Sequence, residues 1–150
     1  MDHSWRQDPA VPAFDDTVPV ALMDAECAIC SWGARMIHRL DRSGRVRICP
    51  IQSPLGRALL AHHGFEPRDP SSWLYLDQGR AHSDFDAVIH AGESFGGWGR
   101  LCAVLRLIPK RPRDWLYLQL ARNRYRIFGR GDLCGLPDPG LQARILRPPA

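Results

Sequence analysis

Hydrophobic and polar positions in the first third of the chain predict a strand, a helix and a second strand. Residues 17–23 are apolar and β-branched, which indicates a short buried strand. Across residues 28–40 apolar side chains recur at helical spacing, which predicts an amphipathic helix with Trp32 in the core. Residues 45–50 alternate polar and apolar side chains, as a strand does. This unit implies a parallel pair of strands with a right-handed crossover.

The middle of the chain predicts a second helix, a hairpin and a third helix. Ser53 can cap a helix that has a proline at its first position and continues to residue 63. Residues 73–76 and 80–83 are predicted as strands joined by a tight turn, and residues 85–91 as a helix. The predicted order of elements is therefore β-α-β-α-β-β-α.

The last third of the chain has a less regular pattern. Four glycines in residues 92–99 predict a loose segment, and the apolar residues 101–108 predict a helix that stops at a proline. Residues 110–113 are predicted as a linker and residues 115–128 as a second long helix. A last helical turn is predicted at residues 141–146.

Length and composition favour one globular domain. The chain has 150 residues, of which 45% are hydrophobic and 24% charged, as is ordinary for a globular protein. We expect a domain over residues 17–137 that includes a helical extension over residues 100–130. Residues 1–16 are predicted to be a flexible extension and residues 138–150 a tail. The chain begins without the features of a signal peptide, so we expect it in the cytoplasm.

The net charge is +4, and the basic residues are unevenly spread. Between Arg100 and Arg130, nine Lys/Arg residues accompany the single acid Asp114. Such a face is compatible with an acidic partner, a nucleic acid or an anionic membrane surface, whereas the simpler interpretation is a solvated helix face. We expect neither a membrane span nor a nucleic-acid partner.

Two cysteines three residues apart follow the first predicted strand. If a helix begins near Cys27, its thiol lies among the N–H groups of the helix N-terminus, which favour a thiolate. Cys30 lies one turn further along the same face, within reach of a disulfide. We therefore predict Cys27 as an exposed nucleophile and Cys30 as the thiol that resolves the mixed disulfide. With the order of elements, this placement predicts a thioredoxin-like α/β fold, a central mixed sheet flanked by helices, with a C-terminal helical extension.

The same pair of cysteines has two other interpretations: inert core thiols, or half of a zinc site. Zinc would need two further ligands, and no second Cys-x-x-Cys motif is present, so we expect no metal site. Five cysteines cannot all pair within one chain, which fits a reducing compartment. Cys49 and Cys102 are most simply small buried hydrophobes. Cys134 is a candidate third thiol of the site.

Asp24 ends the first predicted strand, three residues before Cys27. Its carboxylate could accept the proton of Cys30 as a general base. Alternatively, it orders the loop by accepting a hydrogen bond from the backbone N–H of Glu26 or Cys27. The two roles are compatible. His38 lies too far along the predicted helix to serve Cys27 and is expected at the surface.

The segment Met23-Asp-Ala-Glu-Cys-Ala-Ile-Cys30 resembles the Asp-x-x-Cys-x-x-Cys signature of the DCC family of predicted thiol–disulfide oxidoreductases. Residues 121–130, with Arg-Tyr-Arg-Ile-Phe-Gly at their centre, resemble that family's C-terminal block. The resemblance spans residues 18–137 and implies a thioredoxin-like fold and a redox role. Ala25 departs from the family's usual glycine and would be strained if that position needs a positive φ. Glu26 departs by placing a negative charge beside Cys27.

Tyr125 lies in that C-terminal block between Arg124 and Arg126. We expect these residues to dock the C-terminal helix on the redox helix, with an arginine salt bridge to Asp24 or Asp41. The alternative is a clamp for a carboxylate or a phosphate.

We predict a thiol–disulfide oxidoreductase that acts through Cys27 and Cys30, with Asp24 as the third site residue. No bound cofactor is expected, because the cysteines carry the electrons. The partners would be a disulfide-containing protein or small molecule and a reducing partner. The alternatives are a non-catalytic thioredoxin-like binding module that uses the arginine-rich face, and a zinc-binding Cys-x-x-Cys protein.

Overall fold

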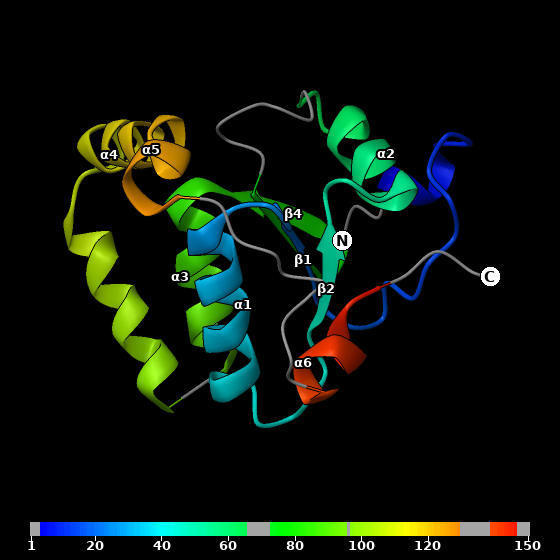
Figure 1. Cartoon of the computed structure of the whole chain (residues 1–150), viewed down its shortest axis with the longest axis horizontal. Helices are drawn as coiled ribbons and strands as arrows, with labels where there is room; N and C mark the ends of the chain where they lie inside the picture. Colours follow the sequence, from blue (N-terminus) through cyan, green and yellow to red (C-terminus); the bar gives the residue numbers. More distant parts are fainter. Residues whose placement is uncertain (1–3, 66–72, 96, 130–138, 147–150) are drawn as a thin grey trace.

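The computed structural model describes residues 4–65, 73–95, 97–129 and 139–146, and within these ranges four short strands form a central sheet (Figure 1). The spatial order of the strands is β2-β1-β3-β4. β1 (Val20–Met23) is parallel to β2 (Arg47–Pro50) and antiparallel to β3 (Leu74–Asp77), which pairs with β4 (Arg80–Ser83) as a hairpin. The sheet is therefore mixed, as predicted.

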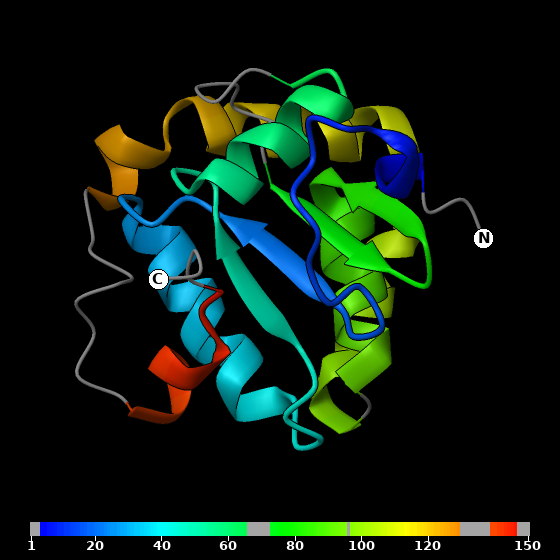
Figure 2. The same ribbon diagram turned by 90° about the vertical axis from the view of Figure 1, so that its right-hand side faces the viewer.

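Helices cover both faces of this sheet. α1 (Ala28–Leu40) and α3 (Asp84–Phe95) lie on one side, and α2 (Pro54–His62) lies on the other with the N-terminal segment (Figures 1 and 2). The element order β1-α1-β2-α2-β3-β4-α3 matches the predicted one. The thioredoxin-like α/β fold expected from the sequence is thus confirmed.

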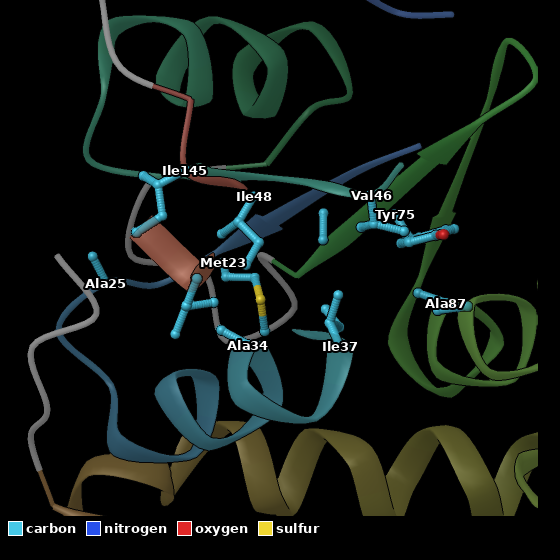
Figure 3. Close-up of a cluster of buried hydrophobic side chains, with 12 residues drawn as sticks. Met23, Ala25, Ala34, Ile37, Val46, Ile48, Tyr75, Ala87 and Ile145 are labelled. Atoms are coloured by element: carbon cyan, nitrogen blue, oxygen red, sulfur yellow. The ribbon is translucent and has the colours of Figure 1, made fainter. Parts of the chain in front are cut away.

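β1 is buried on both faces, because successive side chains of a strand point to opposite sides. Ala21 and Met23 join the apolar cluster beneath α1 and α3 (Figure 3). Val20 and Leu22 join a second cluster on the α2 side. A strand enclosed in this way presents its polar neighbours only beyond its ends, and the first of these at the C-terminal end is Asp24.

The turn between β2 and α2 is tightly packed. The Ser53 hydroxyl accepts a hydrogen bond from the Gly56 N–H at 3.0 Å, which confirms the predicted cap. A Cβ atom on Gly56 would lie 2.2 Å from the Pro50 carbonyl oxygen, so only glycine fits there. This close approach fixes the path of residues 51–53 beyond the end of β2.

The C-terminal extension differs from the two predicted helices and the linker between them. α3 continues to Phe95, into the segment over residues 92–99 predicted as loose. A 3₁₀ helix, η2 (Gly97–Leu107), covers most of the helix predicted over residues 101–108. α4 (Lys110–Arg122) begins inside the predicted linker, because a proline in the first turn of a helix breaks no intrahelical hydrogen bond. The predicted long helix is interrupted at Asn123, and α5 (Arg124–Phe128) follows it.

Both segments outside residues 17–137 contribute to the core in their described parts. A short 3₁₀ helix, η1 (Ser4–Gln7), carries Trp5, which is 3% exposed and packs in the cluster on the α2 side. α6 (Pro139–Arg144) inserts Leu141 beneath α1, and Ile145 bridges to Ile48 of β2. These segments therefore pack on the domain, in contrast to the expected flexible extension and tail.

Arg144 anchors α6 through a buried ion pair. Its Nη1 lies 2.7 Å from Asp41 Oδ2, and its Nε donates to His38 Nδ1 at 2.9 Å. Burial raises the pKa of Asp41, but hydrogen bonds from Ser43, Arg144 and the Val46 N–H outweigh burial and hold that pKa below its ordinary value. His38, expected at the surface, is half-buried because α6 packs over this end of α1.

Replacing Arg144 with methionine should lower the free energy of unfolding by about 3–5 kcal/mol, because Asp41 would remain buried without its cationic partner. Urea unfolding at neutral pH measures this change. Arg42→Met at an exposed neighbouring position is the control and should change stability by less than about 0.5 kcal/mol. Equal stabilities of the two variants would contradict an anchoring role for the ion pair.

Candidate active site

The candidate site lies where β1 ends and α1 begins. Asp24 follows the last residue of β1, and its carbonyl oxygen accepts a hydrogen bond from the Cys27 N–H at 3.3 Å. Cys27 is the N-cap of α1, with extended backbone angles of φ −99° and ψ 129°. The chain thus turns within three residues from a buried strand into the helix that carries both cysteines.

The Asp24 carboxylate is 4% exposed and receives hydrogen bonds from three segments of the chain. Oδ1 accepts from the Glu26 N–H at 2.9 Å and from Gln52 Nε2 at 2.7 Å. Oδ2 accepts from the hydroxyl of Tyr125 on α5. The first of these contacts is the loop-ordering hydrogen bond expected from the sequence.

Gln52 is a member of this network that was not predicted from the sequence. Its Oε1 accepts a hydrogen bond from the Ala25 N–H at 3.1 Å, and its Nε2 donates one to the Asp24 carboxylate. One side-chain amide therefore binds two consecutive residues of the loop. A signal for it was present, because Gln52 follows β2 closely and the ends of parallel strands lie side by side.

Ala25 is accommodated without backbone strain. Among the described residues, Gln78 is the non-glycine residue with a positive φ, so Ala25 does not occupy the left-handed region. The strain that would follow from alanine in place of the family's glycine is therefore absent.

Cys27 and Cys30 are both thiols, and they differ in exposure. Cys27 is 0% exposed, so the expectation of an exposed nucleophile is wrong for this structure. Cys30 is half-buried and packs against the apolar cluster beneath α1. The C-terminal extension lies against the start of this helix.

α5 contacts the residues around the start of α1 through both of its ends. The Tyr125 hydroxyl donates to Asp24, and the carbonyl oxygen of Gly129 accepts from the Ala28 N–H at 3.4 Å. Figures 1 and 2 both show α5 beside the N-terminal end of α1. The predicted docking of the C-terminal block on the redox helix is therefore present, with the tyrosine as the residue that reaches Asp24.

The predicted arginine salt bridge to Asp41 is formed by a different arginine, and the predicted bridge to Asp24 stays a prediction. The partner of Asp41 is Arg144 of α6 rather than an arginine of the C-terminal block. Arg126 is exposed, and the side chain of Arg124 lies outside the described part.

Trp32 is 60% exposed, which corrects its predicted place in the core. α1 buries the face that carries Cys30, Ala34 and Ile37, spaced four and three residues apart. Trp32 lies two residues from both Cys30 and Ala34 and therefore on the opposite side of the helix. Helical spacing alone could not show which of the two faces packs on the sheet.

Cys49 is a buried thiol apart from this network. It is 0% exposed, and burial raises its pKa to about 11, although a contact with the Ser53 hydroxyl lowers it. It is therefore protonated at neutral pH and is the small buried hydrophobe that the sequence predicted. The side chain of Cys102 and the whole of Cys134 lie outside the described residues, so their predicted roles stay predictions.

The alternative interpretations gain little from the geometry. Within the described ranges no three His, Cys, Asp or Glu side chains gather as metal ligands would. Several cations of the basic stretch are paired with α3: Arg106 lies 2.6 Å from Glu93, and Arg113 lies 2.8 Å from Asp86. No helix in the described part is long and apolar enough to cross a membrane.

Comparison with known proteins agrees with the geometry. The chain is 30% identical to the uncharacterized protein YuxK of Bacillus subtilis over 85% of this chain and 93% of that one. It is 32% identical to a chloroplastic DCC family protein of Arabidopsis thaliana over 88% of this chain and 77% of that one. No solved structure matches significantly. Because one relative is chloroplastic, the cytoplasmic location stays a prediction.

The family model for DCC1-like thiol-disulfide oxidoreductases matches residues 21–130, from β1 to the residue after Gly129. The match includes Asp24, both cysteines of the motif and α5. This supports a general thiol–disulfide function for the chain. The chain belongs to the DCC1-like thiol-disulfide oxidoreductase family.

Proposed function

We propose that this protein is a dithiol–disulfide oxidoreductase in which Cys27 is the nucleophile, Cys30 the resolving thiol and Asp24 the general base. The observation that carries the proposal is the buried Asp24 carboxylate, held at the start of the helix that bears both thiols. A carboxylate so placed can take up the proton that the second thiol must lose. Family membership supports the same class of chemistry.

The first step is attack by the Cys27 thiolate on one sulfur of a substrate disulfide. The substrate S–S bond breaks, one substrate thiolate leaves, and a mixed disulfide joins Cys27 to the other substrate sulfur. The cap position of Cys27 favours this step, because the N-terminal end of a helix stabilises negative charge. Glu26, which is exposed beside it, opposes that effect.

The second step releases the substrate. The Cys30 thiol gives its proton to Asp24, and the resulting thiolate attacks the Cys27 sulfur. The mixed disulfide breaks, the second substrate thiolate leaves, and a Cys27–Cys30 disulfide forms. Two electrons have then passed from the protein to the substrate. A dithiol reductant restores the protein, and the same steps in reverse oxidise a dithiol.

This scheme defines the partners by class. The cysteines carry the electrons, so the proposal includes no bound cofactor. The substrate is a disulfide-containing protein or small molecule, and the reductant is a dithiol. Because Cys27 is 0% exposed, exchange also requires a local movement at the start of α1 that admits the substrate sulfur.

The proposal predicts a reversible two-electron couple between Cys27 and Cys30. Titration with mixtures of reduced and oxidised dithiothreitol, followed by alkylation and peptide mass mapping, should show these two thiols lost together. Cys49 should stay reduced throughout, because it is buried and its pKa is about 11.

Serine variants assign the roles in this couple. Cys30→Ser should accumulate a mixed disulfide at Cys27, whereas Cys27→Ser should form none at Cys30. The reverse pattern would contradict the assigned order of attack. Absence of a Cys27–Cys30 disulfide in oxidising buffer would sink the redox proposal as a whole.

Asp24→Asn should slow the second step at neutral pH by about 100-fold, because general base catalysis typically contributes at least that much. It should also remove the acid limb of that step's pH–rate profile. The measurement is single-turnover release of substrate from a preformed Cys27 mixed disulfide.

Glu26→Gln is the matched control, because it removes a carboxylate two residues away that is exposed. It should leave the acid limb of the second step in place. If Asp24→Asn and Glu26→Gln gave the same profile, the general base would have to be another group.

A further inference from the structure

One hydrogen bond joins the candidate base to a helix far along the chain. The Tyr125 hydroxyl donates to Oδ2 of Asp24 although the two residues are 101 positions apart. Two further donors, the Glu26 N–H and the Gln52 amide, both bind Oδ1. The two carboxylate oxygens therefore have different surroundings.

We propose that Tyr125 is a positioning residue of the thiol–disulfide reaction that acts through Asp24 by setting the orientation and proton affinity of Oδ2. The inference rests on the proposed function and adds a residue to it. Tyr125 does not contact the reacting sulfurs in this scheme. Its effect reaches Cys30 by way of the carboxylate.

The chemistry of the two oxygens indicates where the proton goes. Oδ1 accepts two hydrogen bonds from groups that can only donate, whereas the hydroxyl at Oδ2 can itself accept one, so the proposal places the proton from Cys30 at Oδ2. A hydroxyl can both donate and accept. Tyr125 can therefore donate to the ionised carboxylate and then accept from the protonated one, which a backbone N–H cannot do.

The donor also sets how readily Oδ2 takes the proton. A hydrogen bond to an ionised acceptor is stronger than one to a neutral acceptor. Loss of the hydroxyl should therefore favour the protonated form of Asp24 and move the acid limb of the second step to higher pH.

The position of the hydroxyl is fixed by the way α5 is held. α5 has five residues, and the Gly129 carbonyl at its far end binds the Ala28 N–H at 3.4 Å. Gly129 has a φ of +77°, which turns the chain sharply at the end of the helix. Tyr125 binds Asp24, which precedes Cys27 in the sequence, and Gly129 binds Ala28, which follows it. The two ends of one short helix are therefore attached on either side of Cys27 along the chain.

The described groups that bind Asp24 come from several elements. Glu26 shares its loop and binds the carboxylate through its N–H, and the N–H of Cys27, the N-cap of α1, binds the Asp24 carbonyl oxygen. Tyr125 comes from α5, and the neutral Gln52 comes from the turn after β2. Of these, the Tyr125 hydroxyl can be removed with little change in side-chain shape. Tyrosine to phenylalanine is therefore the most direct test.

The test follows the second step in the full chain with Cys102 and Cys134 changed to serine. An aromatic disulfide that releases a coloured thiolate forms the mixed disulfide on Cys27, and attack by Cys30 then releases the second coloured thiolate. Tyr125→Phe should move the acid limb of this release upward by about one pH unit, the size expected for loss of one charge-assisted hydrogen bond. The rate on the alkaline plateau should change less than about threefold.

A double-mutant cycle shows whether the effect passes through Asp24. On the Asp24→Asn background, Tyr125→Phe should have no further effect beyond about twofold. Tyr117→Phe is the matched control, because it removes a hydroxyl from α4 and keeps the ring that packs on Phe85 at 5.2 Å. It should leave the acid limb unchanged.

A second variant keeps the test decisive if Tyr125→Phe does not fold. Site-specific 3-fluorotyrosine at position 125 makes the hydroxyl a stronger donor, so the acid limb should move to lower pH. A purely structural role would change the melting temperature and leave the limb in place.

The outcomes separate this inference from the function on which it rests. An unshifted limb in both variants of Tyr125, with a normal Cys27–Cys30 couple, would overturn the role of Tyr125 and leave the function standing. Loss of the couple in the unmodified protein would overturn the function itself.

Discussion

Burial of the Asp24 carboxylate is the constraint that joins the parts of this structure. An ionised carboxylate that is 4% exposed is costly unless donors surround it. Here the donors come from the loop after β1, the turn after β2 and the C-terminal α5. These three segments must therefore meet at one point. The C-terminal extension is in this sense part of the candidate site, although it lies outside the β-α-β-α-β-β-α core.

The sheet explains why the meeting point lies where it does. β1 is apolar and enclosed by helices on both faces, so a polar side chain can follow it only at its end. β2 runs parallel beside it, which places Gln52 next to Asp24. The close contact of Gly56 with the Pro50 carbonyl holds the turn that carries Gln52. Backbone packing at one glycine thus supports a side chain of the candidate site.

Much of the fold and part of the candidate site could be predicted from local sequence signals. The features that depend on tertiary contacts could not. The period of apolar residues located α1, the Ser53–Pro54 pair located α2, and the hairpin followed from its turn. Trp32 was misplaced because spacing defines a helical face without telling which face is buried. The start of α4 was missed because Pro112 resembles a helix breaker yet lies in the first turn. The Tyr125–Asp24 contact was expected only as docking of a block, since its exact partner atoms depend on packing across 101 positions.

The contact between the end of α5 and the start of α1 also bears on how such a site can work. The Ala28 N–H is one of the amides at the helix start that would otherwise stabilise a thiolate, and the Gly129 carbonyl occupies it. A carbonyl oxygen carries partial negative charge, so this contact opposes ionisation of the neighbouring thiol. Release of this amide requires displacement of the C-terminal end of α5. Tyr125 lies at the other end of that helix, on Asp24. In the proposed reaction, the C-terminal end of α5 therefore affects the first attack by Cys27. Its N-terminal end affects the transfer of a proton from Cys30 to Asp24.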